Sequence, residues 1–126
     1  MRIAAAIFVA MHGVGHVIWF MCAWTPSALG KLRRAGFISE PNGMAGKALG
    51  VVSLIALIGF AASAWGIWTE ASWWPPFLMG SVLASVPVLL GIWNPFGTVS
   101  FSALLADIGL GAATLMPWGE RLLGSH

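Results

Sequence analysis

The chain has 126 residues, of which 59% are hydrophobic and only 8% are charged, and its formal net charge is +2. Because a soluble domain carries about 25% charged residues, this composition excludes an ordinary water-soluble protein and indicates a membrane protein of one domain. So few charges give no indication of nucleic-acid binding, and a single cysteine, Cys22, excludes chemistry that needs a cysteine pair.

Four apolar segments have the length of membrane spans, which need about 20 residues each. They are residues 3–24, 44–68, 76–93 and 98–116, and segments rich in Pro, Gly and charged residues separate them. The first segment is longer than the apolar region of a signal peptide and no cleavage site follows it, so we expect it to stay in the protein. The sequence therefore predicts an all-α, integral membrane four-helix bundle formed by residues 1–126.

The basic residues are distributed unevenly between the two sides of the predicted bundle. Four lie in or beside the segment joining the first two spans and two lie on the other side: Lys31, Arg33, Arg34 and Lys47, against Arg2 and Arg121. Because positive loops stay cytoplasmic, we expect this segment in the cytoplasm and both termini outside, in a bacterial inner membrane. Lys31, Arg33 and Arg34 form a basic patch on a predicted short helix, which lies on anionic lipid or, alternatively, docks a partner.

Tryptophans and small residues mark the ends and the packed faces of the predicted spans. Small residues recur at four-residue spacing, for example at Ser81 and Ser85, which suits close helix packing. The tryptophans are typical of aromatic belts at the two membrane interfaces. One belt is predicted from Trp24 and Trp93, and the other from Trp65, Trp68, Trp73, Trp74 and Trp118.

Three ionisable residues lie at similar depth inside the spans. Residues 11–16 read "MHGVGH", which places His12 and His16 on one helix face near the centre of the first span. Asp107 is the only charged residue deep within a span, and its helix face carries small or polar residues. Because a carboxylate at this depth needs a partner or a proton, we expect Asp107 to contact the face bearing His12 and His16.

Four interpretations of these three residues are open. His12, His16 and Asp107 form a purely structural hydrogen-bonded group, a site that handles protons or a ligand, a divalent metal site, or part of a haem site. The metal site would use His12 and His16, with Asp107 as a candidate third ligand. Haem would need a second copy of the chain or a methionine on the opposite side. The sequence by itself assigns no cofactor.

The first span also resembles the opening of a known family. Arg2, the apolar residues up to Phe8, and His12 and Gly13 within "MHGVGHVIWF" are similar to the first helix of DoxX-like small four-span bacterial membrane proteins. That helix often carries Lys four residues after the histidine, where this chain has His16. The resemblance implies a membrane partner of redox enzymes, some linked to quinone or thiol oxidation, and it transfers no catalytic residue.

Three functional hypotheses follow. The first is an accessory or ligand-binding subunit of a membrane redox system, which binds quinone, lipid or metal and contacts the bilayer and a redox partner or a second copy. The second is a small proton-coupled transporter, and the third is a structural assembly factor. An apolar pocket between helices would favour the first, and a water-filled path to His12 the second. No hydrolase or phosphate-binding motif is present, so no enzymatic reaction is assigned.

Overall fold

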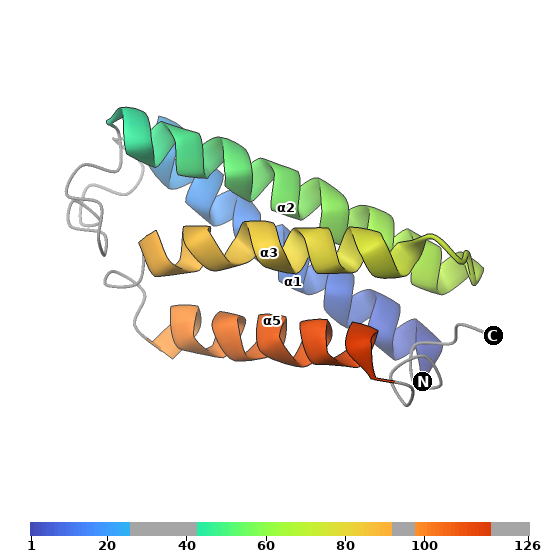
Figure 1. Cartoon of the computed structure of the whole chain (residues 1–126). Coiled ribbons are helices and arrows are strands. Elements are labelled where there is room, and N and C mark those ends of the chain that lie inside the picture. Colours follow the sequence, from blue (N-terminus) through green and yellow to red (C-terminus); the bar gives the residue numbers. More distant parts are fainter. Residues whose placement is uncertain (26–42, 92–97, 117–126) are drawn as a thin grey trace.

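The structure is a computed structural model, and it describes residues 1–25, 43–91 and 98–116 (Figure 1). These residues form four α-helices: α1 (Arg2–Trp24), α2 (Met44–Thr69), α3 (Trp74–Gly91) and α5 (Thr98–Leu115). Each helix is long and apolar enough to cross a membrane. The predicted all-α four-helix architecture is confirmed, and the chain is a multi-pass membrane protein.

The helix bounds follow the predicted spans, with one informative difference at α3. This helix begins at Trp74, ahead of the predicted start at Pro76. Pro75 and Pro76 fit its first turn because backbone N–H groups there have no partner within the helix. The predicted basic patch of Lys31, Arg33 and Arg34 and its short helix lie outside the described residues, as do Trp93 and Trp118.

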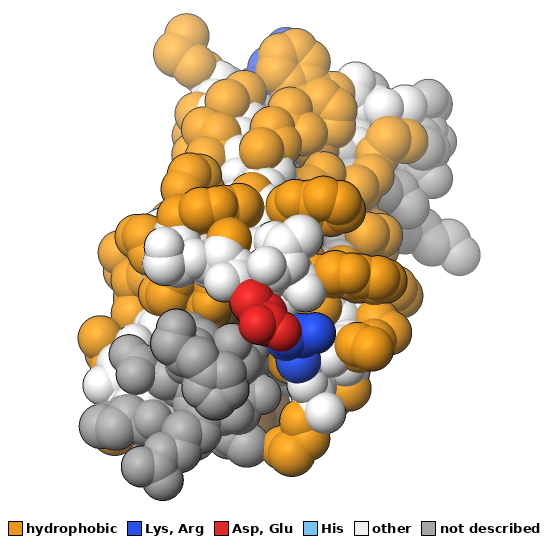
Figure 2. Space-filling view, turned by 90° about the vertical axis from the view of Figure 1, so that its right-hand side faces the viewer, with side chains coloured by type: hydrophobic (Ala, Val, Ile, Leu, Met, Phe, Trp, Pro, Cys, Tyr) orange, Lys and Arg blue, Asp and Glu red, His pale blue; other side chains and the backbone are white. Residues whose placement is uncertain are grey.

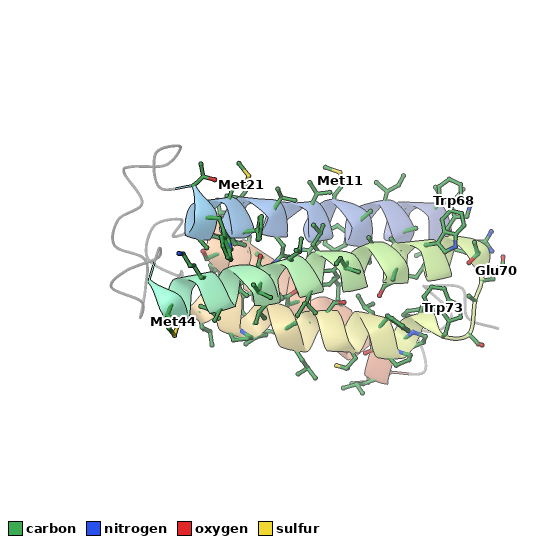
Figure 3. All side chains as sticks on the ribbon, turned by 90° about the horizontal axis from the view of Figure 1, so that it is seen from above. Met11, Met21, Met44, Trp68, Glu70 and Trp73 are labelled. Atoms are coloured by element: carbon green, nitrogen blue, oxygen red, sulfur yellow. The ribbon has the colours of Figure 1, made fainter. Side chains whose placement is uncertain are left out.

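Close helix packing joins consecutive helices, namely α1 with α2, α2 with α3, and α3 with α5. Figure 1 shows α3 between α2 and α5, with α1 crossing behind. Apolar side chains also cover the outer faces of the helices, where Ile58, Leu83 and Ile108 are each about 60% exposed. Figure 3 shows such side chains pointing away from the bundle. An apolar outside is what a lipid-facing bundle requires, since lipid tails are as apolar as these side chains.

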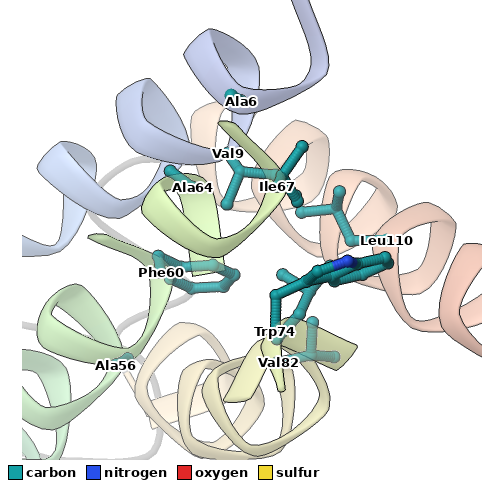
Figure 4. Packing of buried hydrophobic residues seen from close by; sticks show 10 residues of the cluster. Ala6, Val9, Ala56, Phe60, Ala64, Ile67, Trp74, Val82 and Leu110 are labelled. Carbon is teal, nitrogen blue, oxygen red and sulfur yellow. The ribbon is translucent and has the colours of Figure 1, made fainter. Parts of the chain in front are cut away.

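The main apolar core lies where all four helices meet around two aromatic rings. Phe60 of α2 and Trp74 of α3 are fully buried together with Ile67 and Val9, and Leu110 of α5, 7% exposed, packs against them (Figure 4). The predicted place of Trp74 in an aromatic belt is therefore wrong, because its side chain turns into the core and is only 1% exposed. Trp65, Trp68 and Trp73, at the same end of the bundle, are 64%, 57% and 39% exposed.

Small residues let α2 approach its neighbours closely. A Cβ added to Gly50 would lie 2.7 Å from the Ala23 Cβ, and one added to Gly66 would lie 2.6 Å from the Trp74 Cβ. Neither position has room for a larger side chain, so the predicted packing role of the small residues holds at these contacts.

One end of the bundle carries an ion pair between the first two helices. Arg2, at the start of α1, pairs with Glu70, which ends α2 in a left-handed conformation with φ of 59°. The next N–H, of Ala71, donates to the Gly66 carbonyl at 2.9 Å and closes the helix end. Figure 2 looks onto this end and shows an acidic and a basic side chain side by side in a largely hydrophobic surface. The pair holds the ends of α1 and α2 together.

Candidate functional site

A buried carboxyl group links three helices in the middle of the bundle. Asp107 of α5 is fully buried, and its Oδ1 is hydrogen-bonded to Nε2 of His12 on α1 at 2.7 Å. The other oxygen, Oδ2, is hydrogen-bonded to Ser85 Oγ on α3 at 2.5 Å. The prediction that Asp107 contacts the histidine-bearing face of the first span is confirmed.

His16 joins the same group through two serines. Its Nε2 lies 3.0 Å from Ser85 Oγ, and its Nδ1 lies 3.3 Å from Ser53 Oγ on α2. The Ser53 hydroxyl donates to the backbone carbonyl of His16 at 2.7 Å. His16, Ser53 and Ser85 are all buried, so these bonds form away from lipid and water. All four helices thus contribute to one hydrogen-bonded group, here called the polar cluster: His12, His16, Ser53, Ser85 and Asp107.

Phe60 holds both imidazole rings in place. Its ring meets the His12 ring edge-on, with centroids 4.9 Å apart and planes at 88°, and stacks on the His16 ring at 5.6 Å and 23°. The contact needs Gly13, because a Cβ there would lie only 2.7 Å from the Phe60 Cβ. A Cβ at Gly15, in contrast, would meet nothing within 4 Å. The glycines of "MHGVGH" therefore serve different purposes, one for close packing and one beside open space.

The two serines of the polar cluster are not predicted from the sequence. The four-residue spacing of Ser81 and Ser85 predicts only helix packing, and no pattern marks Ser53. Ser81 does differ from Ser85, since its hydroxyl donates to the Phe77 carbonyl of its own helix at 2.7 Å. Asp107 itself indicates that further polar residues lie nearby, because a carboxyl group with two oxygens in an apolar core needs more than one hydrogen-bond partner. Hydroxyl groups at similar depth on the neighbouring spans were the natural candidates.

A groove of about 370 Å³ lies between α1 and α5, and His12 and His16 form part of its wall. The walls are otherwise mostly apolar, and Gly15 and Ser102 also border it. Three wall residues, Phe8, Met11 and Val99, are 51%, 66% and 57% exposed, so the groove opens on the outer surface of the bundle. Its volume falls within the range of about 300–1,000 Å³ that is typical of small-molecule sites.

A second groove, of about 400 Å³, lies between α2 and α3 and differs in chemistry. Apolar and small residues and a single hydroxyl line it, and no ionisable side chain does. That hydroxyl, of Ser81, already donates to its own helix. Of these two grooves, the one between α1 and α5 brings an apolar cavity together with titratable groups.

The metal hypothesis gains no support from this geometry. Within residues 1–25, 43–91 and 98–116, no three His, Cys, Asp or Glu side chains form a group that could hold a metal ion. Both ring nitrogens of His16 face serine hydroxyls, and Nε2 of His12 faces Asp107. An ion bound by His12 and His16 would have to replace hydrogen bonds that the polar cluster already makes.

The arrangement provides a cluster of polar side chains that satisfy one another's hydrogen bonds within apolar surroundings. The Asp107 carboxyl has a partner on each oxygen, which removes most of the cost of its burial. One edge of the cluster, the 10%-exposed side chain of His12, reaches the groove. A molecule from the membrane can therefore meet an imidazole there while the rest of its surface stays in apolar surroundings.

Comparison of the chain with protein-family models, with curated sequences and with solved structures finds no significant match. The resemblance of the first span to DoxX-like proteins therefore stays a prediction.

Proposed function

We propose that this protein binds an apolar molecule with a polar head, of the quinone or lipid class, as an accessory or ligand-binding subunit of a membrane redox system. The observation that carries the proposal is the groove between α1 and α5, which opens on the lipid-facing surface and has His12 in its wall. An apolar pocket with a few polar groups that orient the ligand is the usual form of a small-molecule site.

The redox part of the proposal rests on the resemblance of the first span to DoxX-like proteins. A redox partner or a second copy of the chain would then bind on the apolar outer surface. The proposed setting is a bacterial inner membrane, with the segment between α1 and α2 in the cytoplasm and both termini outside. Four Lys and Arg residues in or beside that segment, against two on the other side, support this orientation.

The groove can be tested with a matched pair of glycine substitutions. A Cβ at Gly15 or at Gly80 meets nothing within 4 Å, and each residue borders one of the two grooves. Gly15→Leu fills the groove between α1 and α5, whereas Gly80→Leu fills the one between α2 and α3. Both changes add the same apolar side chain to a helix, so we expect both variants to fold.

The measurement is the set of lipids and quinones that copurify with the protein, analysed by native mass spectrometry and lipid extraction. We expect a bound apolar molecule in the wild-type protein and in Gly80→Leu, and its loss in Gly15→Leu. Loss only in Gly80→Leu would move the site to the other groove. If no variant carries a bound molecule, and quinones and lipids added to nanodiscs do not bind, the proposal is wrong and a structural assembly role replaces it.

A further inference from the structure

The hydrogen bonds of the polar cluster determine which of its atoms carry protons. A serine hydroxyl has one proton to donate. The proton of Ser53 goes to the His16 backbone carbonyl, so at Nδ1 of His16 the serine oxygen accepts and the nitrogen must carry a proton. The proton of Ser85 lies on one of two bonds, either to Asp107 Oδ2 or to His16 Nε2, and the other bond must receive its proton from the partner.

Two proton placements make every one of these bonds while leaving the cluster without net charge. In the first, Ser85 donates to Asp107 Oδ2, and His16 carries protons on both ring nitrogens. In the second, Asp107 carries a proton on Oδ2 and donates it to Ser85, which donates to Nε2 of His16. Both placements leave the cluster without net charge, which an apolar core favours.

Both placements also give His12 the same form. Its Nε2 carries a proton and donates to Oδ1 of Asp107, so Nδ1 keeps its lone pair. In the first placement His16 carries a second ring proton. If that proton moved to His12, His16 would have a single N–H while both serines already donate their protons elsewhere, so one of the two contacts between His16 and the serines would be lost. The titratable groups facing His12 are His16 and Asp107, and α2 and α3 contribute only Ser53 and Ser85 to the cluster.

Two residues that line the groove, His12 and Ser102, each carry a hydrogen-bond acceptor. One is Nδ1 of His12, which has no hydrogen-bond partner among the residues that the structure describes. The other is Ser102 Oγ, which spends its proton on the Val99 carbonyl of its own helix at 2.9 Å and keeps its oxygen lone pairs. A ligand whose head accepts hydrogen bonds but has none to donate finds no complement at these two atoms.

We propose that the groove selects ligands whose head carries a hydroxyl group, a phenol or hydroquinone with an apolar tail, through a hydrogen bond to Nδ1 of His12. The inference rests on the proposed function, because it names the chemistry of the molecule that the groove would hold. Asp107 acts as a positioning residue that keeps the proton of His12 on Nε2. No bond is broken in this binding step, and the hydroxyl proton stays on the ligand.

The test uses two probes that differ only in the hydroxyl group, para-dodecylphenol and its methyl ether. Protein in nanodiscs is given equal amounts of both, and the bound fraction of each is read by native mass spectrometry. We expect the phenol to bind about three- to tenfold more tightly, the effect of one hydrogen bond. His12→Phe, which keeps an aromatic ring beside Phe60, should remove the preference. Thr69→Val, which removes a hydroxyl bonded only to its own helix, should leave it intact.

A second measurement does not depend on the variants. In ¹⁵N spectra of histidine-labelled wild-type protein, we expect His12 to show a protonated Nε2 and an unprotonated Nδ1. A protonated Nδ1 would overturn the inference, and so would equal binding of the phenol and the ether in wild-type protein. With equal binding that Gly15→Leu abolishes, the groove is still a site and only the hydroxyl selection fails. If neither probe binds at all, the hydroxyl selection is wrong, and the quinones and lipids of the earlier test decide the proposed function.

Discussion

At the scale of single residues, the most consequential side chain is Asp107. It is 0% exposed, yet both of its oxygens have partners, one on α1 and one on α3. The effect of replacing Asp107 on stability should therefore depend on whether the new side chain can make both hydrogen bonds, more than on whether it is charged.

We expect Asp107→Asn to stay close to wild-type stability and Asp107→Ala to lose about 1–3 kcal/mol in the free energy of unfolding, the cost of unsatisfied buried polar groups. An asparagine oxygen can still accept from His12, and its amide can donate to Ser85, as a protonated Asp107 would. The measurement is unfolding in detergent, followed by tryptophan fluorescence. Equal destabilisation by Asn and Ala would contradict the neutral placement in which Asp107 carries the proton.

The contact between His12 and Asp107 can be isolated by a double-mutant cycle. Each of His12→Ala and Asp107→Ala leaves the other residue without its partner, so the double variant should lose less stability than the sum of the single variants. The difference should be about 0.6–1.7 kcal/mol, as for other hydrogen bonds between membrane helices. Thr69→Val, at the far end of α2, combined with Asp107→Ala serves as the control and should be additive. Additivity in the test pair would mean that the contact contributes nothing.

At the scale of helices, the packing of α1 on α2 depends on one glycine. Phe60 closes against Gly13 and there contacts both histidine rings. The same motif supplies its own control in Gly15, which borders open space.

We expect Gly13→Ala to lower the free energy of unfolding by about 1–3 kcal/mol, because the added methyl group overlaps Phe60 and forces the helices apart. Gly15→Ala should be neutral or slightly stabilising, since alanine favours a helix and meets no neighbour. Unfolding in detergent measures both. If the two alanine variants behaved alike, the close contact at Gly13 would not determine how α1 and α2 pack.

The helices themselves could be predicted from the sequence, because span length and hydrophobicity depend only on local composition. The contact of His12 with Asp107 could be predicted too, since a lone buried carboxyl constrains its own surroundings. The roles of Ser85 and Trp74 could not be predicted, for a shared physical reason. A serine serves packing or hydrogen bonding, and a tryptophan near a span end lies in the interface or the core. Only the rotation of each helix about its axis decides between these roles.

At the scale of the whole molecule, the even number of described spans places the start of α1 and the end of α5 on the same side of a membrane. The Arg2–Glu70 pair and the turn at Ala71 lie at one end, and the start of α2 at Met44 lies at the other (Figure 3). The charge difference between the sides sets the expected orientation.

Cysteine labelling in a Cys22→Ala background tests that orientation. We expect Ser72→Cys, at an exposed position between α2 and α3, to react with an impermeant thiol reagent on intact cells. Ser39→Cys, in the segment between α1 and α2, should react only after the membrane is opened. The reverse pattern would place both termini in the cytoplasm.

The sideways opening of the groove between α1 and α5 changes what binding affinity means for this protein. Acyl chains of the surrounding bilayer fill any opening on its surface, so a ligand enters only by exchange with lipid. Because one apolar tail replaces another, the exchange gains little from the hydrophobic effect. Occupancy then follows the mole fraction of ligand in the membrane: extra lipid should dilute it, and extra buffer should not. In such a two-dimensional solvent, selection rests on the few atoms of the head that lipid tails cannot imitate.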